Sequence, residues 1–159
     1  SGRISPTEAA HVRAELEGRV ALILDGGPCQ VGIESTVVDA CGDTPRLLRP
    51  GSITAPMLRE WFATSPEQIV NNHNPASPGM LESHYAPTLP MRLNAQNVEE
   101  GEALLAFGPA LPGAAHCCNL SPSGNLQEAA ANLFRMLRQL DACPAKAIAV
   151  MPIPHNDAE

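Results

Sequence analysis

The sequence has little of three things: aromatic side chains, basic residues and long apolar runs. Aromatics make up 3% of 159 residues, so aliphatic side chains within a hydrophobic content of 44% have to fill the core. Ten Lys and Arg against 17 Asp and Glu give a formal net charge of -7. That balance argues against a broad nucleic-acid-binding face, which needs clustered cations. No apolar run approaches the roughly 20 residues that cross a bilayer, so we expect no membrane span.

Common cofactor and metal signatures are missing as well. The sequence has no Walker loop and no dinucleotide fingerprint. Its five cysteines form no Cys-x-x-Cys pair, and its Asp, Glu and His are scattered, so we expect no protein-held metal and no disulfide framework. Reduced thiols and the lack of a signal peptide predict a cytoplasmic protein. Because the chain opens on Ser1 without a Met, we expect the natural start to lie elsewhere.

Local patterns in the first third predict one helix and several strands. The series Ser5-Pro6-Thr7-Glu8 has the spacing of a capping box, which predicts a helix with Ser5 at its N-cap. The apolar run 20–24 predicts a buried strand. Residues 36–38 are β-branched at three successive positions, and residues 46–49 follow a turn, so the two segments predict a hairpin. A short helix is expected over 54–62, with Leu58, Trp61 and Phe62 facing inward.

The remainder of the chain predicts a connection followed by a second α/β unit. Residues 64–90 contain five of the 16 prolines and show little periodicity, which is typical of an interdomain linker. Strand patterns at 103–107 and 147–151 flank a strongly amphipathic helix over 125–140. Strand, helix and strand in this order predict a parallel βαβ unit.

Three places carry groups suited to binding a phosphate or a small substrate. A helix that starts at Ser5 would offer free N–H groups to a phosphate, although Ser5 would also serve simply as a cap. Ser35 and Thr36 enter a strand with side chains on opposite faces, so one would face a site while the other packs. Arg49 presents a rigid donor fork that matches phosphate oxygens, or it pairs with a surface carboxylate.

Four blocks of the sequence, in order, resemble the L-threonylcarbamoyladenylate synthases, which are YrdC-like proteins. The resemblance rests on these segments: Ser1-Gly2-x-x-Ser5-Pro6-Thr7, then Gly32-Ile33-Glu34-Ser35-Thr36-Val37-Val38-Asp39 and Leu48-Arg49-Pro50-Gly51, and last Pro78-Gly79-Met80 with His84-Tyr85-Ala86-Pro87. Residues 119–154 are similar to the small C-terminal domain of the two-domain form. The resemblance implies the C-terminal part of a YrdC-like twisted-sheet domain at 1–63, a linker or lid at 64–90 and a small Rossmann-like parallel α/β domain at 91–159.

The resemblance also implies a chemistry and a set of site residues. The family joins L-threonine, bicarbonate and ATP with Mg²⁺ into an adenylate, releases pyrophosphate and passes the product to a tRNA-modifying transferase complex that makes threonylcarbamoyladenosine. Ser5 would contact ATP, Arg49 would hold its phosphates, and Ser35 or Thr36 would meet threonine or the nucleotide. Ser5, Ser35 and Arg49 would then line one triphosphate pocket, which the linker closes with His84 and Tyr85.

The departures from the family pattern limit what this stretch does alone. The Lys-x-Arg segment and the Ser-x-Asn start of the family signature are absent, and the chain stops before the usual closing helix. We therefore expect a piece of the enzyme that binds ATP weakly and does not turn over by itself, because ATP chemistry relies on cations to offset its charge. Two alternatives stay open: a YrdC-like module that binds double-stranded RNA or tRNA without catalysis, and a purely structural two-domain remnant.

Overall fold

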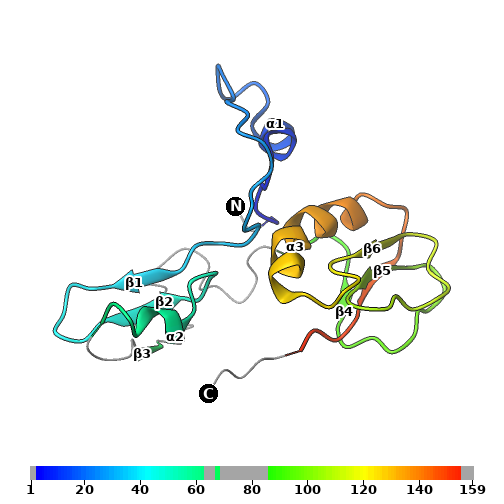
Figure 1. The fold of residues 1–159 in the computed structure, drawn as a ribbon. Coiled ribbons are helices and arrows are strands. Elements are labelled where there is room, and N and C mark those ends of the chain that lie inside the picture. The colour runs from blue at the N-terminus through cyan, green and yellow to red at the C-terminus, as the bar shows by residue number, and fades with distance from the viewer. Residues whose placement is uncertain (1–2, 63–66, 69–85, 155–159) are drawn as a thin grey trace. The chain divides into compact units, whose positions relative to one another are not determined.

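The computed structural model describes residues 3–62, 67–68 and 86–154, and its fold is mixed α/β, as predicted (Figure 1). The chain forms two compact units, each with its own sheet. Unit 1 consists of Ser1–Arg3, Ile33–Ala86 and Asn156–Glu159, and unit 2 of Ile4–Gly32 and Pro87–His155. The twisted-sheet type of the first domain and the linker at 64–90 remain predictions.

Unit 1 is built on the predicted hairpin. Strands β1 (Val37–Asp39) and β2 (Arg46–Arg49) pair antiparallel, and the register shifts between Val37 and Val38. Strand β3 (Glu67–Gln68) adds to β2 in parallel, giving the order β1-β2-β3. Leu47 of β2 is buried, as β-branched and aliphatic strand residues on a core face should be. The sequence pattern thus located this hairpin correctly.

The helix expected at 54–62 is shorter than predicted. Helix α2 is Ala55–Leu58, with Pro56 in its first turn and Leu58 buried, as expected. The inward position of Trp61 was wrong, because its side chain is 81% exposed. The helix ends before the next turn, so the helical spacing that would place Trp61 beside Leu58 no longer applies.

Unit 2 contains a four-stranded parallel sheet in the order β4-β7-β5-β6. Its strands are β4 (Met91–Arg92), β5 (Glu102–Ala106), β6 (Cys117–Asn119) and β7 (Ala147–Val150). β5 and β7 pair in parallel, which confirms the predicted βαβ unit. All five residues of β5 are buried, as expected for a central strand of a parallel sheet. The two outer strands, β4 and β6, were not predicted because each is only two or three residues long.

Helix α3 (Leu126–Asp141) covers one face of this sheet and packs on β5 and β6. It begins where Asn125 accepts a hydrogen bond from the Glu128 N–H at 2.9 Å, a regular N-cap. Ala129, Phe134, Leu137 and Leu140 form its buried stripe. The other face is a separate apolar cluster built on four buried residues, Ala95, Leu104, Ala106 and Ala149. Alternation along β5 places Leu104 and Ala106 on this second face and Leu105 on the helix side.

A partly buried ion pair lies at the amino-terminal edge of the same sheet. Arg92 of β4 donates from Nε to Glu102 Oε1 at 2.8 Å and from Nη2 to Oε2 at 2.6 Å, and the Glu99 N–H donates to the same carboxylate. The Arg92 hydrogen bonds are the largest cause that lowers the pKa of Glu102, to about 2. This bidentate contact between a guanidinium and a carboxylate links β4 to β5, although β7 lies between them in the sheet.

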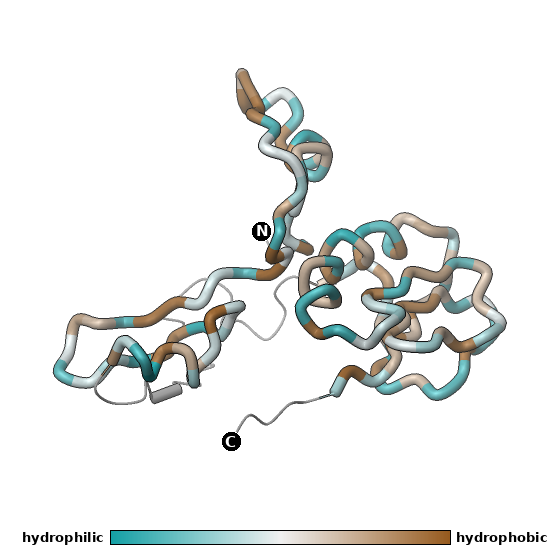
Figure 2. Tube along the Cα trace, in the orientation of Figure 1, coloured by the Kyte–Doolittle hydropathy of each residue, from teal (hydrophilic) through white to brown (hydrophobic). Residues whose placement is uncertain are grey.

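The strand predicted at 20–24 was wrong. Leu22 is 75% and Leu24 is 85% exposed, and neither belongs to a strand. Figure 2 shows this stretch as the hydrophobic end of the segment that follows the first helix. An apolar run becomes a strand only when a neighbouring strand pairs with it, and no described residue does so here. Among the described residues, no helix is long and apolar enough to cross a membrane.

Candidate functional site

In unit 1, two of the predicted site residues contact each other directly. Arg49, the last residue of β2, donates from Nε to the Ser35 carbonyl at 2.9 Å and from Nη2 to Ser35 Oγ at 3.1 Å. The Glu34 carboxylate lies 3.7 Å from the same Nη2, and the Arg49 side chain is only 14% exposed. The arginine fork therefore fixes both the backbone and the hydroxyl of Ser35. Glu34, which received no role from the sequence, belongs to this group because it precedes Ser35 in the same motif and its carboxylate lies near the guanidinium.

Thr36 has a different role from its neighbour. Its hydroxyl donates to the Ile53 carbonyl at 2.7 Å and accepts from the Ile53 N–H at 3.1 Å. These two bonds hold the segment that leads into α2 against the start of β1. Thr36 is therefore engaged within unit 1, and the expectation that the hydroxyl of Ser35 serves a site stays a prediction.

Gly51 allows this arrangement because the surrounding backbone leaves no room for a side chain at this position. A Cβ at this position would lie 2.4 Å from the Thr36 nitrogen and 2.6 Å from the Glu34 carbonyl oxygen. Real Cβ atoms do not approach backbone so closely, so only glycine permits the chain after Arg49 to pass across residues 34–36. Glycine at position 51 is therefore a steric requirement of the chain path beside the Ser35–Arg49 contact.

In unit 2, the predicted helix start at Ser5 was wrong. Helix α1 is Ala9–Leu16, and its N-cap is Glu8, without a side-chain cap bond. Residues 4–7 are irregular chain, held by contacts that a helical turn would break. The Thr7 N–H donates to Nδ1 of His11, and the Thr7 carbonyl accepts from the Cys29 N–H at 2.8 Å. Ser5 thus lies ahead of the helix instead of capping it.

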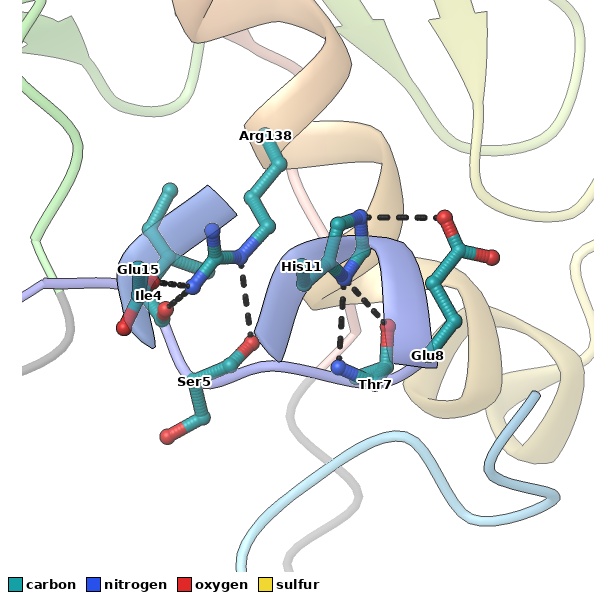
Figure 3. Close-up of polar contacts among 7 residues, drawn as sticks. All are labelled: Ile4, Ser5, Thr7, Glu8, His11, Glu15 and Arg138. Carbon is teal, nitrogen blue, oxygen red and sulfur yellow. Dashed lines mark hydrogen bonds and ion pairs between the residues drawn. The ribbon is translucent and has the colours of Figure 1, made fainter. Parts of the chain in front are cut away.

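Arg138 of α3 reaches this same irregular segment (Figure 3). Its Nε donates to the Ser5 carbonyl at 3.3 Å, and its Nη2 contacts the Ile4 carbonyl and the Glu15 carboxylate. The sequence did not indicate a role for Arg138, because a cation on an amphipathic helix is usually a solvated residue. Its position next to the buried Leu137 was the available signal, since such an arginine borders the packed face of the helix.

His11 is the third group that holds this segment. Its Nδ1 accepts from the Thr7 N–H at 3.2 Å, while its Nε2 lies 3.1 Å from Glu8 Oε1. An acceptor at Nδ1 places the ring proton on Nε2, so this arrangement requires the neutral ring. Burial is the largest cause that lowers the pKa of His11 below 6.5. Arg138 and Arg135 lower it further, and Glu8 and Glu15 oppose the shift.

This geometry predicts a pH-dependent stability. Because the folded pKa of His11 is below the unfolded value of 6.5, the unfolded state binds more protons, and stability falls as the pH drops below 6.5. Between pH 8 and pH 5.5 the Tm of the wild type should fall more than that of His11→Gln, by on the order of 2 °C. Differential scanning fluorimetry of both proteins measures this, and equal Tm shifts would contradict it. The other histidines are common to both proteins and cancel in the comparison.

A cavity of about 260 Å³ opens at the amino-terminal edge of the parallel sheet of unit 2. Glu99, Glu100 and Glu102 line it, together with His116 and the chain at Ala145. The residues that line it include three carboxylates and no Lys or Arg, so it offers no cationic side chain to a triphosphate. Ligands of open parallel sheets also bind at the carboxyl ends of the strands, so this cavity does not match the predicted nucleotide site.

The remaining predicted site residues are not placed together. His84 and Tyr85 lie outside the described residues. Ser5 belongs to unit 2, whereas Ser35 and Arg49 belong to unit 1, so a pocket shared by all three stays a prediction. Among the described residues, no three His, Cys, Asp or Glu side chains are grouped as a metal ion requires.

Comparisons with known proteins identify the family of this chain. The family description "Threonylcarbamoyl-AMP synthase, C-terminal domain" matches residues 53–159, which is most of the chain. The chain belongs to the threonylcarbamoyl-AMP synthase family. A second family description, "Telomere recombination", matches residues 1–51. The suspected resemblance is therefore confirmed, and the family boundary falls between the Arg-Pro-Gly turn and helix α2.

Several members of the family are similar in sequence and structure. The threonylcarbamoyl-AMP synthase of Bacillus subtilis is 45% identical over 58% of this chain and 28% of its own length. The enzyme of Pyrococcus abyssi is 31% identical over 89% of this chain and 46% of its own length. The crystal structure of P. abyssi Sua5 complexed with L-threonine matches with a TM-score of 0.81 at 27% identity, covering 97% of this chain and 50% of that one. The chain thus spans half or less of these relatives.

Proposed function

We propose that the protein to which this chain belongs forms L-threonylcarbamoyladenylate from L-threonine, bicarbonate and ATP, which is bound as its magnesium complex. The observation that carries the proposal is the contact of Arg49 with Ser35, which joins the Arg-Pro-Gly turn to the motif Gly-Ile-Glu-Ser-Thr in a chain of the threonylcarbamoyl-AMP synthase family. A solved relative, P. abyssi Sua5, was crystallised with L-threonine, which supports threonine as one substrate. The product would serve threonylcarbamoyladenosine formation in tRNA through a separate transferase complex.

The proposed reaction has two steps. The threonine nitrogen bonds to the carbon of bicarbonate, with loss of water, and gives a carbamate. A carbamate oxygen then bonds to the α-phosphorus of ATP, while the bond from that phosphorus to the bridging β-oxygen breaks. Pyrophosphate leaves with the electron pair of that bond. No covalent enzyme intermediate is needed, so the protein acts by positioning the reactants and by stabilising charge.

Arg49 and Ser35 suit these two tasks. The guanidinium of Arg49 carries a fixed positive charge on a partly buried strand end, where electrostatic effects are stronger than in bulk water. We assign it to the negative charge that gathers on the phosphates as pyrophosphate leaves. Ser35, whose hydroxyl is held by the same guanidinium, is assigned to threonine or the nucleotide, and Thr36 to packing against Ile53. Ser5 is assigned to ATP on the resemblance alone.

Arg49 provides the test of this proposal in the natural full-length protein. Arg49→Ala should lower kcat/KM for ATP on the order of 100-fold, because a preorganised charge next to the reacting phosphates is lost. Arg49→Lys keeps the charge but not the fork, and should lose about tenfold. The measurement is pyrophosphate release that requires both threonine and bicarbonate.

Arg46 is the matched control on the same strand. Its guanidinium pairs with Asp39, and its side chain is 52% exposed. Arg46→Gln should therefore keep kcat/KM within about twofold, since exposed ion pairs contribute little. Pyrophosphate release that does not depend on threonine would contradict the proposal. Equal losses of kcat/KM in the Arg46 and Arg49 variants would contradict it as well. Protection of the wild type from heat by RNA but not by ATP would favour the RNA-binding alternative instead.

The linker is part of the same proposal. We assign His84 and Tyr85 to a lid that closes over the bound substrates and excludes water from the adenylate. A second solved structure of P. abyssi Sua5 carries alanine in place of a histidine and the adjacent tyrosine, and this chain also has an adjacent His-Tyr pair. A cytoplasmic location, direct contact with tRNA and weak ATP binding by these 159 residues alone stay predictions.

A further inference from the structure

The side chain of Arg138 joins the segment that carries Ser5 to the C-terminal α/β layer. Arg138 lies in the last turns of α3, and its guanidinium contacts the successive carbonyls of Ile4 and Ser5 and the Glu15 carboxylate of α1 (Figure 3). Its side chain is 18% exposed, and that of Glu15 is 27% exposed. These contacts join residues that are more than 120 positions apart in the chain.

The contacts restrain the backbone on both sides of Ser5. Ile4 is 4% exposed and sits in the core of unit 2, so the chain is anchored just before Ser5. Pro6 limits the backbone of Ser5 to extended conformations. Beyond it, Thr7 is held by His11 and by the Cys29 N–H. In Figure 3 the Ser5 side chain points away from Arg138, so the guanidinium holds the backbone and leaves the hydroxyl directed elsewhere.

We propose that Arg138 is a positioning residue for Ser5, through which the C-terminal layer sets the affinity of the enzyme for ATP. This inference rests on the proposed function, because it takes Ser5 as a contact of ATP. Arg138 itself contacts the chain and not the substrate. Loss of the Arg138 side chain frees the carbonyls of residues 4 and 5, so the chain before α1 samples more conformations. The Ser5 hydroxyl then spends less time in the orientation that contacts ATP.

The test separates ATP affinity from turnover in the natural full-length protein. Arg138→Ala should raise KM for ATP about tenfold, with kcat and KM for threonine changed less than about twofold, because it weakens only the ATP subsite. Arg138→Lys retains the charge but not the two-carbonyl contact and should raise KM for ATP about threefold. Hydrogen exchange at the amides of residues 4, 5, 7 and 8 should be faster in each variant that has a raised KM for ATP; Pro6 has no amide hydrogen. This readout needs no activity.

Two controls make the outcome decisive. Arg135 lies on the same helix and donates to Asn132 within it, so Arg135→Ala should leave KM for ATP unchanged. Glu15→Gln removes the ion pair but keeps both carbonyl contacts and should also leave it unchanged. An active wild type whose Arg138→Ala variant keeps its KM for ATP would overturn the inference and spare the proposed function. An inactive wild type would overturn the proposed function, and faster exchange at residues 4–8 would then still support the restraint by Arg138.

Discussion

Gly51→Ala should abolish adenylate formation, with a loss on the order of 1,000-fold in kcat/KM. The added Cβ would lie 2.4 Å from the Thr36 nitrogen, 2.6 Å from the Glu34 carbonyl oxygen and 2.7 Å from the Ser35 carbonyl carbon. All three are backbone atoms, so no side chain can rotate away to make room. The chain after Arg49 must move off the start of β1, and the hydrogen bonds from Arg49 to Ser35 break with it.

Gly42→Ala is the matched control for this result. Gly42 lies in the turn of the same hairpin, and a Cβ there would meet only the Thr44 carbonyl at 3.9 Å, an ordinary contact. Its backbone is not in the left-handed region, so alanine fits without strain. The pyrophosphate-release assay compares the two variants. A Gly51→Ala protein that retains a tenth or more of wild-type activity would show that the junction yields and that the steric argument is wrong.

The second large effect is expected at Gly32, in unit 2. An alanine Cβ would lie 2.2 Å from the backbone oxygen of Ala131 in α3, and the backbone of Gly32 has φ near +71°. Both the overlap and the left-handed backbone oppose any side chain. Gly32→Ala should lower the free energy of unfolding by about 3–5 kcal/mol, because the loop after α1 must then lift off the helix.

Gly26 offers the comparison for Gly32. It precedes Gly32 in the same loop, has nothing within 4 Å of its added Cβ and does not have a left-handed backbone. Gly26→Ala should change stability by less than about 0.5 kcal/mol or raise it slightly. Urea unfolding of both variants measures the difference. Equal unfolding midpoints would mean that the loop does not rest on α3 through Gly32.

The parts of the fold that were predicted correctly depend on short-range patterns. The apolar stripe of α3, from Leu126 to Leu140, is nearly sufficient to predict a helix, because a sixteen-residue amphipathic segment can bury one continuous face. β5 and β7 are apolar runs of ordinary strand length flanking that helix. The β1–β2 hairpin has β-branched residues and a turn in between. For the site, the motif that carries Ser35 and the Arg-Pro-Gly turn were both found in the sequence, and the structure brings them into contact.

Two of the wrong predictions concern segments whose structure depends on contacts outside their own sequence pattern. Ser5 has the sequence of an N-cap. However, His11 accepts a hydrogen bond from the Thr7 N–H and Arg138 donates to the Ser5 carbonyl, and the helix begins only at Ala9. Leu22 and Leu24 have the sequence of a buried strand but no neighbouring strand among the described residues.

By itself, the sequence determined the α/β class, the parallel βαβ unit, the family and most of the residues proposed for the site. These follow from patterns within about 16 residues or from motifs readable in order. Only the tertiary structure decided that Arg49 grips Ser35, that Thr36 packs against Ile53 and that Arg138 holds the chain beside Ser5. A hydrogen bond across 14 to 133 positions depends on where the backbone places its two ends, and no local preference encodes that distance.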